Sequence, residues 1–162
     1  MPLRLLLIRH GLSSFNRENR IQGRNDLSTL TEEGLLQAEK AGKAIEKLSI
    51  QAIYTSPLQR ALETATAIAR SRVKKIDPII ENDLLEVDLG PWSGLTIDEV
   101  KEKYPDSYGV WAKHPEDLTI IKEDGTQHKP IKDLFSQAER FLAKIINIHN
   151  PDKNETIVLV GH

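Results

Sequence analysis

Cysteine is absent from this sequence of 162 residues, and positive charge is not in excess. A chain without cysteine forms no disulfide, uses no thiolate nucleophile and holds no Cys-ligated zinc. Lys and Arg together number 22 and Asp and Glu 24, which gives a formal net charge of −2. Because a polynucleotide is bound mainly through positive charge, we expect no nucleic-acid partner. A reducing compartment fits the lack of cysteine, so we expect a cytoplasmic protein.

Long apolar runs and several catalytic motifs are also missing. The apolar stretch at residues 3–8 stops at Arg9-His10, before a full signal-peptide core. Nowhere do roughly 20 apolar residues, the length of a membrane span, follow one another, so we expect neither export nor a membrane span. The sequence holds no G-x-S-x-G elbow, P-loop or G-x-G-x-x-G loop, which disfavours serine hydrolases and nucleotide-dependent chemistry. No histidine or carboxylate cluster has metal-ligand spacing, so we expect no metal.

Short apolar segments alternate with amphipathic ones along the chain. The expected strands are residues 5–8, 50–55, 76–80 and 156–160. The expected helices follow Thr31, Ser56-Pro57 and a capping box at residues 96–99, and a further one spans residues 134–145. This alternation predicts an α/β fold, a three-layer sandwich with a mostly parallel sheet and helices on both faces.

Three features refine that fold. Residues 5–8 are continuously apolar, which predicts a strand buried on both faces, and Pro78 places the strand at 76–80 near a sheet edge. Prolines recur through the middle of the chain, so we expect residues 108–130 to be mainly loop within one domain over 1–162. No helix follows the strand at 156–160. We therefore expect either that C-terminal elements of the fold are missing or that a partner chain, as in a homodimer, covers this strand.

Charged and imidazole side chains stand at the ends of the expected strands. Arg9-His10 follows the first strand, Arg60 opens the helix after the second, and Gly161-His162 follows the last. Ligands of open α/β sheets bind beyond the carboxyl ends of the strands, so we expect these side chains to face one cavity. Two guanidinium and two imidazole groups at a helix N-terminus suit a doubly charged phosphomonoester.

A reaction at such a site needs a nucleophile and a proton donor. His10 is the candidate nucleophile toward phosphorus, because nearby arginine charges lower a histidine pKa and keep the imidazole neutral. Glu86 is the candidate acid, since apolar neighbours raise a carboxyl pKa, and Asp88 is the competing choice. Each residue alone would be unremarkable. Their joint placement at strand ends is what predicts a site.

Five segments follow one another in an order typical of one family. They are Leu7-Ile8-Arg9-His10-Gly11 with Asn16, Gln22-Gly23 with the block at residues 30–34, and the segments 56–65, 85–96 and 158–162. Together they resemble the histidine phosphatase superfamily, in its phosphoglycerate-mutase-like branch, over almost the whole chain.

The resemblance implies a phosphohistidine mechanism that needs neither a metal nor an organic cofactor. His10 would attack phosphorus in line. Arg9, Arg60 and His162 would hold the phosphoryl oxygens and stabilise their charge in the transition state. Glu86 would first protonate the leaving oxygen and then activate water.

The same resemblance places Asn16, Gln22 and Gly23 on the substrate side. The chain departs from the family at residues 127–132, which read Gln-His-Lys-Pro-Ile-Lys where many relatives carry Gly-Glu-Ser. This departure leaves open the shape of an irregular substrate cap over residues 87–130. Relatives also continue past the second histidine, so we expect a free α-carboxylate on His162 to oppose phosphate binding.

The leading expectation is a metal-independent phosphomonoester hydrolase that acts on a small phosphorylated metabolite. A cofactor-dependent phosphoglycerate mutase is the alternative within the family, although the short chain and its Gln22-Gly23-Arg24-Asn25 segment look more like the hydrolytic relatives. A non-catalytic phosphate-ligand binding domain is the alternative from another class. Sugar phosphates, phosphoglycerates, phosphoserine and cofactor precursors all fit the expected site.

Overall fold

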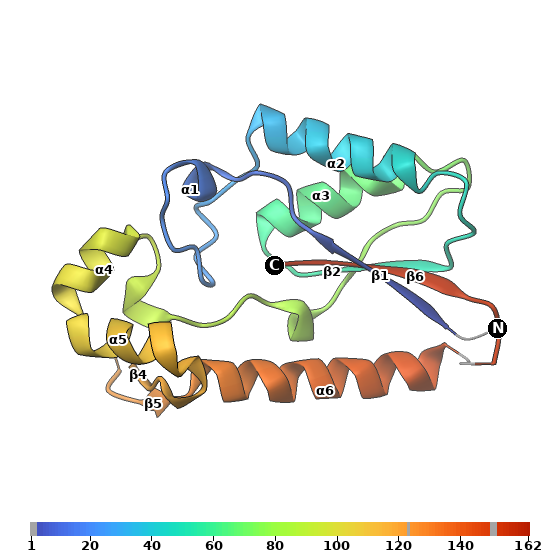
Figure 1. The fold of residues 1–162 in the computed structure, drawn as a ribbon. Helices are drawn as coiled ribbons and strands as arrows, with labels where there is room; N and C mark the ends of the chain where they lie inside the picture. Colours follow the sequence, from blue (N-terminus) through green and yellow to red (C-terminus); the bar gives the residue numbers. More distant parts are fainter. Residues whose placement is uncertain (1–2, 123, 150–151) are drawn as a thin grey trace.

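The computed structural model describes residues 3–122, 124–149 and 152–162. Its main sheet has four parallel strands in the order β1-β6-β2-β3 (Figure 1). They are β1 (Arg4–Arg9), β6 (Thr156–Gly161), β2 (Ala52–Thr55) and β3 (Ile79–Ile80). The strand β6 pairs with β1 on one side and β2 on the other, so the last strand in sequence is central in space.

Helices cover both faces of this sheet. The helices are α1 (Ser14–Arg17), α2 (Glu32–Ala44), α3 (Gln59–Arg70), α4 (Ile97–Lys103), α5 (Pro105–Lys113) and α6 (Pro130–Ile148). Figure 1 shows α2 and α3 on one face and α6 on the other. Val158 and Val160 of β6 pack in the α3 core, while Ile157 and Leu159 pack with Phe141 of α6. The predicted three-layer α/β fold is confirmed.

Local sequence signals explain where most helices begin. Thr31 accepts a hydrogen bond from the Gly34 N–H at 3.0 Å and caps α2, as predicted. A capping box of Thr96 and Glu99 opens α4, also as predicted. The start of α3 was predicted two residues too early, because Ser56 stays outside the helix and its hydroxyl accepts a hydrogen bond from the Leu58 N–H.

Two predictions about strands need correction. The strand β1 is not buried on both faces, and Leu7 keeps 78% of its surface exposed. The reason is that β1 is an edge strand of the described sheet and pairs with β6 on one side only. The strand predicted at residues 76–80 is confirmed as an edge strand, but it covers only Ile79–Ile80 after Pro78.

The middle of the chain is more ordered than the prolines predicted. Residues 108–130 were expected to be mainly loop, yet α5 runs to Lys113, and β4 (Ile120–Ile121) pairs with β5 (Gln127–His128). Pro105 follows the end of α4, as predicted, but Pro105 and Pro130 also occupy the first turns of α5 and α6, where a missing N–H costs nothing, so each of them starts a helix. The short 3-10 helices are η1 (Asn82–Leu84), η2 (Gly90–Trp92) and η3 (Pro115–Asp117).

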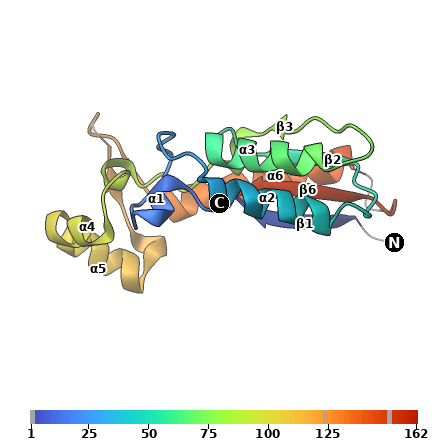
Figure 2. The same cartoon turned by 90° about the horizontal axis from the view of Figure 1, so that it is seen from above.

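This middle region has an apolar core of its own, which lies beyond the carboxyl ends of the strands (Figures 1 and 2). Trp92 is 1% exposed at its centre, in a cluster with Val100, Leu118 and Ile120. The indole contacts the rings of Tyr104, between α4 and α5, and of Tyr108 and Trp111 in α5. Within the ranges given above, no helix has the length and apolarity to cross a lipid bilayer.

Candidate active site

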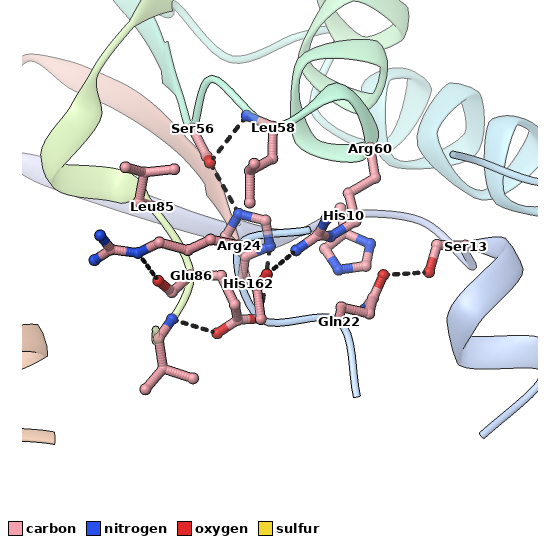
Figure 3. Close-up of polar contacts among 12 residues, drawn as sticks. His10, Ser13, Gln22, Arg24, Ser56, Leu58, Arg60, Leu85, Glu86 and His162 are labelled. Atoms are coloured by element: carbon pink, nitrogen blue, oxygen red, sulfur yellow. Dashed lines mark hydrogen bonds and ion pairs between the residues drawn. The ribbon is translucent and has the colours of Figure 1, made fainter. Parts of the chain in front are cut away.

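The predicted site residues at the strand ends converge (Figure 3). His10 follows β1 and His162 follows β6, and the His10 N–H donates to the Gly161 carbonyl at 2.9 Å, so the pairing of the two strands also sets the two imidazoles side by side. Their ring centroids are 5.3 Å apart. Arg60 lies in the first turn of α3 and is fully buried. Three segments that are distant in sequence thus meet at one place, as the topology of a parallel sheet requires.

Backbone contacts fix the orientation of the His10 ring. Its Nδ1 lies 2.7 Å from the Gly11 carbonyl oxygen, and since a carbonyl only accepts, Nδ1 carries the proton. Nε2 therefore holds the free lone pair. The Gly11 N–H donates to Thr64 of α3 at 3.1 Å, and a Cβ on Gly11 would lie 2.2 Å from the Gly34 carbonyl oxygen. Only glycine lets this loop pass α2 so closely.

His162 is held by the segment that leads into α3. Its Nε2 lies 2.9 Å from the Ser56 hydroxyl, and its side chain is 3% exposed. Nδ1 faces the Glu86 carboxylate, with Oε2 at 3.7 Å. Ser56, predicted only as a helix cap, therefore orients the second histidine.

Burial lowers the pKa of both histidines. The pKa of His10 falls to about 4, mainly through burial, and the charges of Arg60 and Arg9 lower it further while the Gly11 hydrogen bond opposes them. The pKa of His162 falls to about 3, again through burial first and the Arg60 charge second. Both imidazoles are thus neutral near pH 7. The sequence predicted this direction for His10 but named arginine as the cause, whereas burial is the larger one.

Arg60 supports the neighbouring loop as well as facing the histidines. Its Nη1 donates to the Asn25 carbonyl at 3.0 Å and its Nη2 to the Gly23 carbonyl at 2.9 Å. Gly23 has a φ of +49°, and a Cβ there would lie 2.4 Å from the Ser93 hydroxyl. The loop at residues 22–25 is therefore tied to the start of α3 through a glycine that no other residue replaces without strain.

Glu86 and Asp88, the two candidate acids, have different surroundings. Burial raises the pKa of Glu86, although a hydrogen bond from the Val87 N–H and nearby arginines oppose the rise. Burial also pushes the pKa of Asp88 upward, but hydrogen bonds from Lys122 and Gly90 outweigh it and lower that pKa overall. Asp88 forms an ion pair with Lys122 at 3.1 Å. Of the two carboxyls, only Glu86 contacts a histidine of the site and has a raised pKa, which favours the protonated form that an acid needs.

The remaining predicted residues lie around this centre. The Gln22 side-chain oxygen accepts hydrogen bonds from Ser13 and Ser28, both at 2.7 Å, so its amide nitrogen is the end left to donate. Asn16 of α1 contacts the same Ser13 hydroxyl at 2.9 Å. Arg9, at the end of β1, is exposed and lines a cavity of about 540 Å³ that extends from Glu86 and His162 between β1, η1 and α6.

Three buried nitrogen atoms of the site have no hydrogen-bond partner among the described residues. They are His10 Nε2, Arg60 Nε and His162 Nδ1. Buried polar atoms are normally paired, and unpaired ones clustered on three segments point to a bound group that supplies the partners. The Arg60 guanidinium supplies positive charge and a donor, and the unprotonated Nε2 of His10 beside it is free to contact an electrophilic centre, which together suit a tetrahedral oxyanion such as a phosphoryl group. The part of the chain that the structure describes has no cluster of three metal-ligating side chains.

Sequence reasoning missed two residues next to this centre. Arg24 donates from Nε to the Glu86 carbonyl at 3.0 Å and from Nη2 to Gln137 of α6 at 2.8 Å. Gln137 is 5% exposed. One signal was visible, because Gln137 is a polar residue on the helix face that also carries Leu134 and Phe141.

The parallel α/β sheet brings two buried histidines and a buried arginine together at its strand ends, which is where sheets of this class bind their ligands. The chain belongs to the histidine phosphatase superfamily (branch 1), whose family model matches residues 5–162. The family inferred from the five sequence segments is confirmed.

Individual relatives agree with this assignment. A 2-carboxy-D-arabinitol-1-phosphatase of Triticum aestivum is 36% identical over 159 residues, which cover 98% of this chain and 30% of that protein. Phosphoserine phosphatase 1 of Hydrogenobacter thermophilus is 32% identical over 160 residues, or 99% of this chain and 71% of that one. The solved structure of Bacillus stearothermophilus YhfR is 34% identical with a TM-score of 0.84, covering 99% of this chain and 74% of its own. The chain thus spans less than a third of the wheat protein.

Proposed function

We propose that this chain hydrolyses phosphomonoesters of small metabolites through a phosphohistidine on His10. One observation carries the proposal. Nδ1 of His10 donates a hydrogen bond to a backbone carbonyl, and Nε2 is left as an unprotonated, buried and unpartnered nitrogen beside His162. A neutral imidazole oriented in this way is a nucleophile and needs no further activation. Membership of the family and the two phosphatase relatives support the same conclusion.

In the first step, His10 Nε2 attacks phosphorus in line with the leaving oxygen. The P–N bond forms as the P–O bond to the leaving group breaks. Arg60, Arg9 and His162 surround the three remaining oxygens and stabilise the charge they carry in the transition state. Glu86 acts in its protonated form, which burial favours by raising its pKa, and gives its proton to the leaving oxygen.

In the second step, water replaces the histidine. Glu86 is now a carboxylate and takes a proton from a water molecule, whose oxygen forms a bond to phosphorus as the P–N bond breaks. The products are inorganic phosphate and neutral His10, and Glu86 is again protonated. Asn16, Gln22 and Gly23 are proposed to contact the organic part of the substrate, and their hydrogen bonds to Ser13 and Arg60 hold them beside the site.

Several parts of this proposal stay predictions. They are the roles of the individual site residues, a reaction without metal or organic cofactor, a cytoplasmic location and a single domain over 1–162. A homodimer is one of the two alternatives given for the strand without a following helix, and size-exclusion chromatography with light scattering distinguishes it, since a dimer has twice the mass of the 18.3 kDa chain.

The test is hydrolysis of 4-nitrophenyl phosphate by the unmodified chain and by two variants. His10→Ala is expected to abolish turnover. His114→Ala removes a histidine whose side chain is 68% exposed and is the matched control, with turnover unchanged. Turnover that survives in His10→Ala would contradict the proposal. Binding of vanadate without His10-dependent turnover would favour the non-catalytic binding domain instead. Isomerisation of 3-phosphoglycerate, primed by 2,3-bisphosphoglycerate and faster than phosphate release, would favour the mutase.

A further inference from the structure

The segment that carries the proposed acid has little regular structure of its own. Glu86 follows η1 by two residues and precedes η2, and no strand or α-helix of the described chain contains it. Its carboxylate makes one short contact with the adjacent Val87 N–H. The location of the Glu86 carboxyl relative to His162 must therefore come from what holds the backbone around it.

Two side chains from segments distant in sequence hold that backbone, and Figure 3 shows one of them, Arg24, in contact with Glu86. Gln137 of α6 donates from Nε2 to the carbonyls of Leu85, at 2.8 Å, and Asp83, at 3.3 Å. Arg24 donates from Nε to the carbonyl of Glu86 itself, at 3.0 Å. The two side chains are joined to each other, because Arg24 Nη2 donates to Gln137 Oε1 at 2.8 Å. The carbonyl oxygens of residues 83, 85 and 86 thus all accept hydrogen bonds from the joined side chains of Arg24 and Gln137.

Both ends of this pair are anchored in rigid parts of the molecule. Gln137 is 5% exposed and lies one turn of α6 from Phe141, which packs against the sheet. Arg24 follows Gly23, whose carbonyl is bound by the buried Arg60. The pair therefore joins the acid segment to α6 on one side and to the phosphate-binding arginine on the other.

We propose that Gln137 is a positioning residue for the acid step, acting with Arg24 to fix the backbone from which the Glu86 carboxyl reaches the leaving oxygen. The inference rests on the proposed function and goes beyond it, since neither residue touches the phosphate in that mechanism. A shift of the carboxyl by about 1 Å is enough to cost on the order of 100-fold in a positioned proton transfer. Replacing Gln137 is therefore expected to act on proton donation and to leave phosphate binding in place.

The experiment compares two substrates in Gln137→Leu, which keeps the side-chain size and removes the three hydrogen bonds. An alkyl phosphate needs the proton from Glu86, whereas 4-nitrophenyl phosphate has a leaving group that departs without it. We expect kcat/KM to fall roughly 10- to 100-fold for the alkyl ester and less than about 3-fold for the aryl ester. In a Glu86→Gln background the same substitution is expected to change neither rate by more than about 2-fold, because a residue that acts through another adds nothing once that one is gone.

Arg140→Gln is the matched control. Arg140 lies one turn further along α6 and forms an ion pair with Asp83 of the same segment at 2.7 Å, but its side chain is 60% exposed. An exposed ion pair contributes little, so both rates are expected to stay within about 2-fold. If Gln137→Leu does not fold, Arg24→Lys tests the other half of the pair, with the same selective loss expected.

An equal loss on both substrates, or a loss that adds to that of Glu86→Gln, would overturn the inference and give Gln137 a purely structural role. If the unmodified chain shows no His10-dependent turnover at all, the proposed function fails and the inference with it. The two failures are distinguishable, since only the first leaves an active parent enzyme.

Discussion

The two sides of the site are built in different ways. His10 and His162 each follow a strand by one residue, and the paired strands β1 and β6 place both imidazoles. Glu86 stands in a segment without strand or α-helix, whose carbonyls are bound by side chains 62 and 52 residues away in sequence. The phosphate side of the site, which the two histidines form, therefore shares the stability of the sheet. The acid side, which is the segment that carries Glu86, depends on a few side-chain hydrogen bonds, so single substitutions are expected to displace it.

Removing Arg60 is expected to have the largest effect, because this residue serves both sides. Arg60→Met loses a buried charge facing the histidines and the two bonds to the carbonyls of Gly23 and Asn25. We expect kcat/KM to fall by about 10²–10³-fold or more for every phosphomonoester, good and poor leaving groups alike. Steady-state kinetics on an aryl and an alkyl ester measure this. A loss limited to the alkyl ester would show that Arg60 belongs to the acid side only.

Glu86→Gln separates the two sides. The amide keeps the shape of the side chain but cannot give up a proton, so poor leaving groups are expected to lose about 10²-fold or more in the first step. The first step with an aryl ester needs no proton and should persist, visible as a burst of 4-nitrophenol in a stopped-flow trace. Equal loss of the first step for both ester types would remove Glu86 from the acid role.

The pH dependence of kcat/KM shows the ionisation of His10, on the phosphate side, and of Glu86, on the acid side, in one curve. His10 attacks in its neutral form, so activity rises with pH through its lowered pKa of about 4. Glu86 must be protonated, so activity on an alkyl ester falls as pH rises through its raised pKa. Glu86→Gln, measured on the same ester so that substrate ionisation cancels, is expected to lose the alkaline fall and keep the acid rise. An unchanged alkaline limb in the variant would assign it to another group.

Asp88→Asn is expected to have the smallest effect. Asp88 is ionised and paired with Lys122, so its loss should change either rate by less than about 3-fold. A selective loss on alkyl esters as large as that of Glu86→Gln would make Asp88 the acid and break the distinction drawn between the two carboxylates.

The sequence predicts the phosphate side of the site better than the acid side. The positions of His10, Arg60 and His162 could be inferred because each stands at the end of a segment with a clear local pattern, and parallel strands bring their carboxyl ends together. The side chains that hold the Glu86 segment could not be inferred, since the hydrogen bond between Arg24 and Gln137 joins residues 113 positions apart and no local pattern encodes it. The edge position of β1 was missed for a related reason. An apolar run shows that a strand forms but not how many neighbours it has.

The middle region shows a different limit. Pro105 and Pro130 were interpreted as breaks, but the same residue opens a helix when it falls in the first turn. The rings around Trp92 come from α5 and from Tyr104 just before it, and both α4 and α5 are too short to show a convincing apolar face. Their order comes from packing around the indole, which becomes visible only when the elements are assembled.

The most direct measurement is the identification of the phosphorylated atom. The protein is mixed with 4-nitrophenyl phosphate, quenched in alkali, in which phosphohistidine survives, and studied by peptide mass spectrometry and ³¹P–¹H NMR. The account predicts one phosphoryl group on Nε2 of His10, with a longer lifetime in Glu86→Gln because water is no longer activated. Phosphate on Nδ1, on His162 or on a hydroxyl, or turnover with no phosphorylated protein at all, would contradict it.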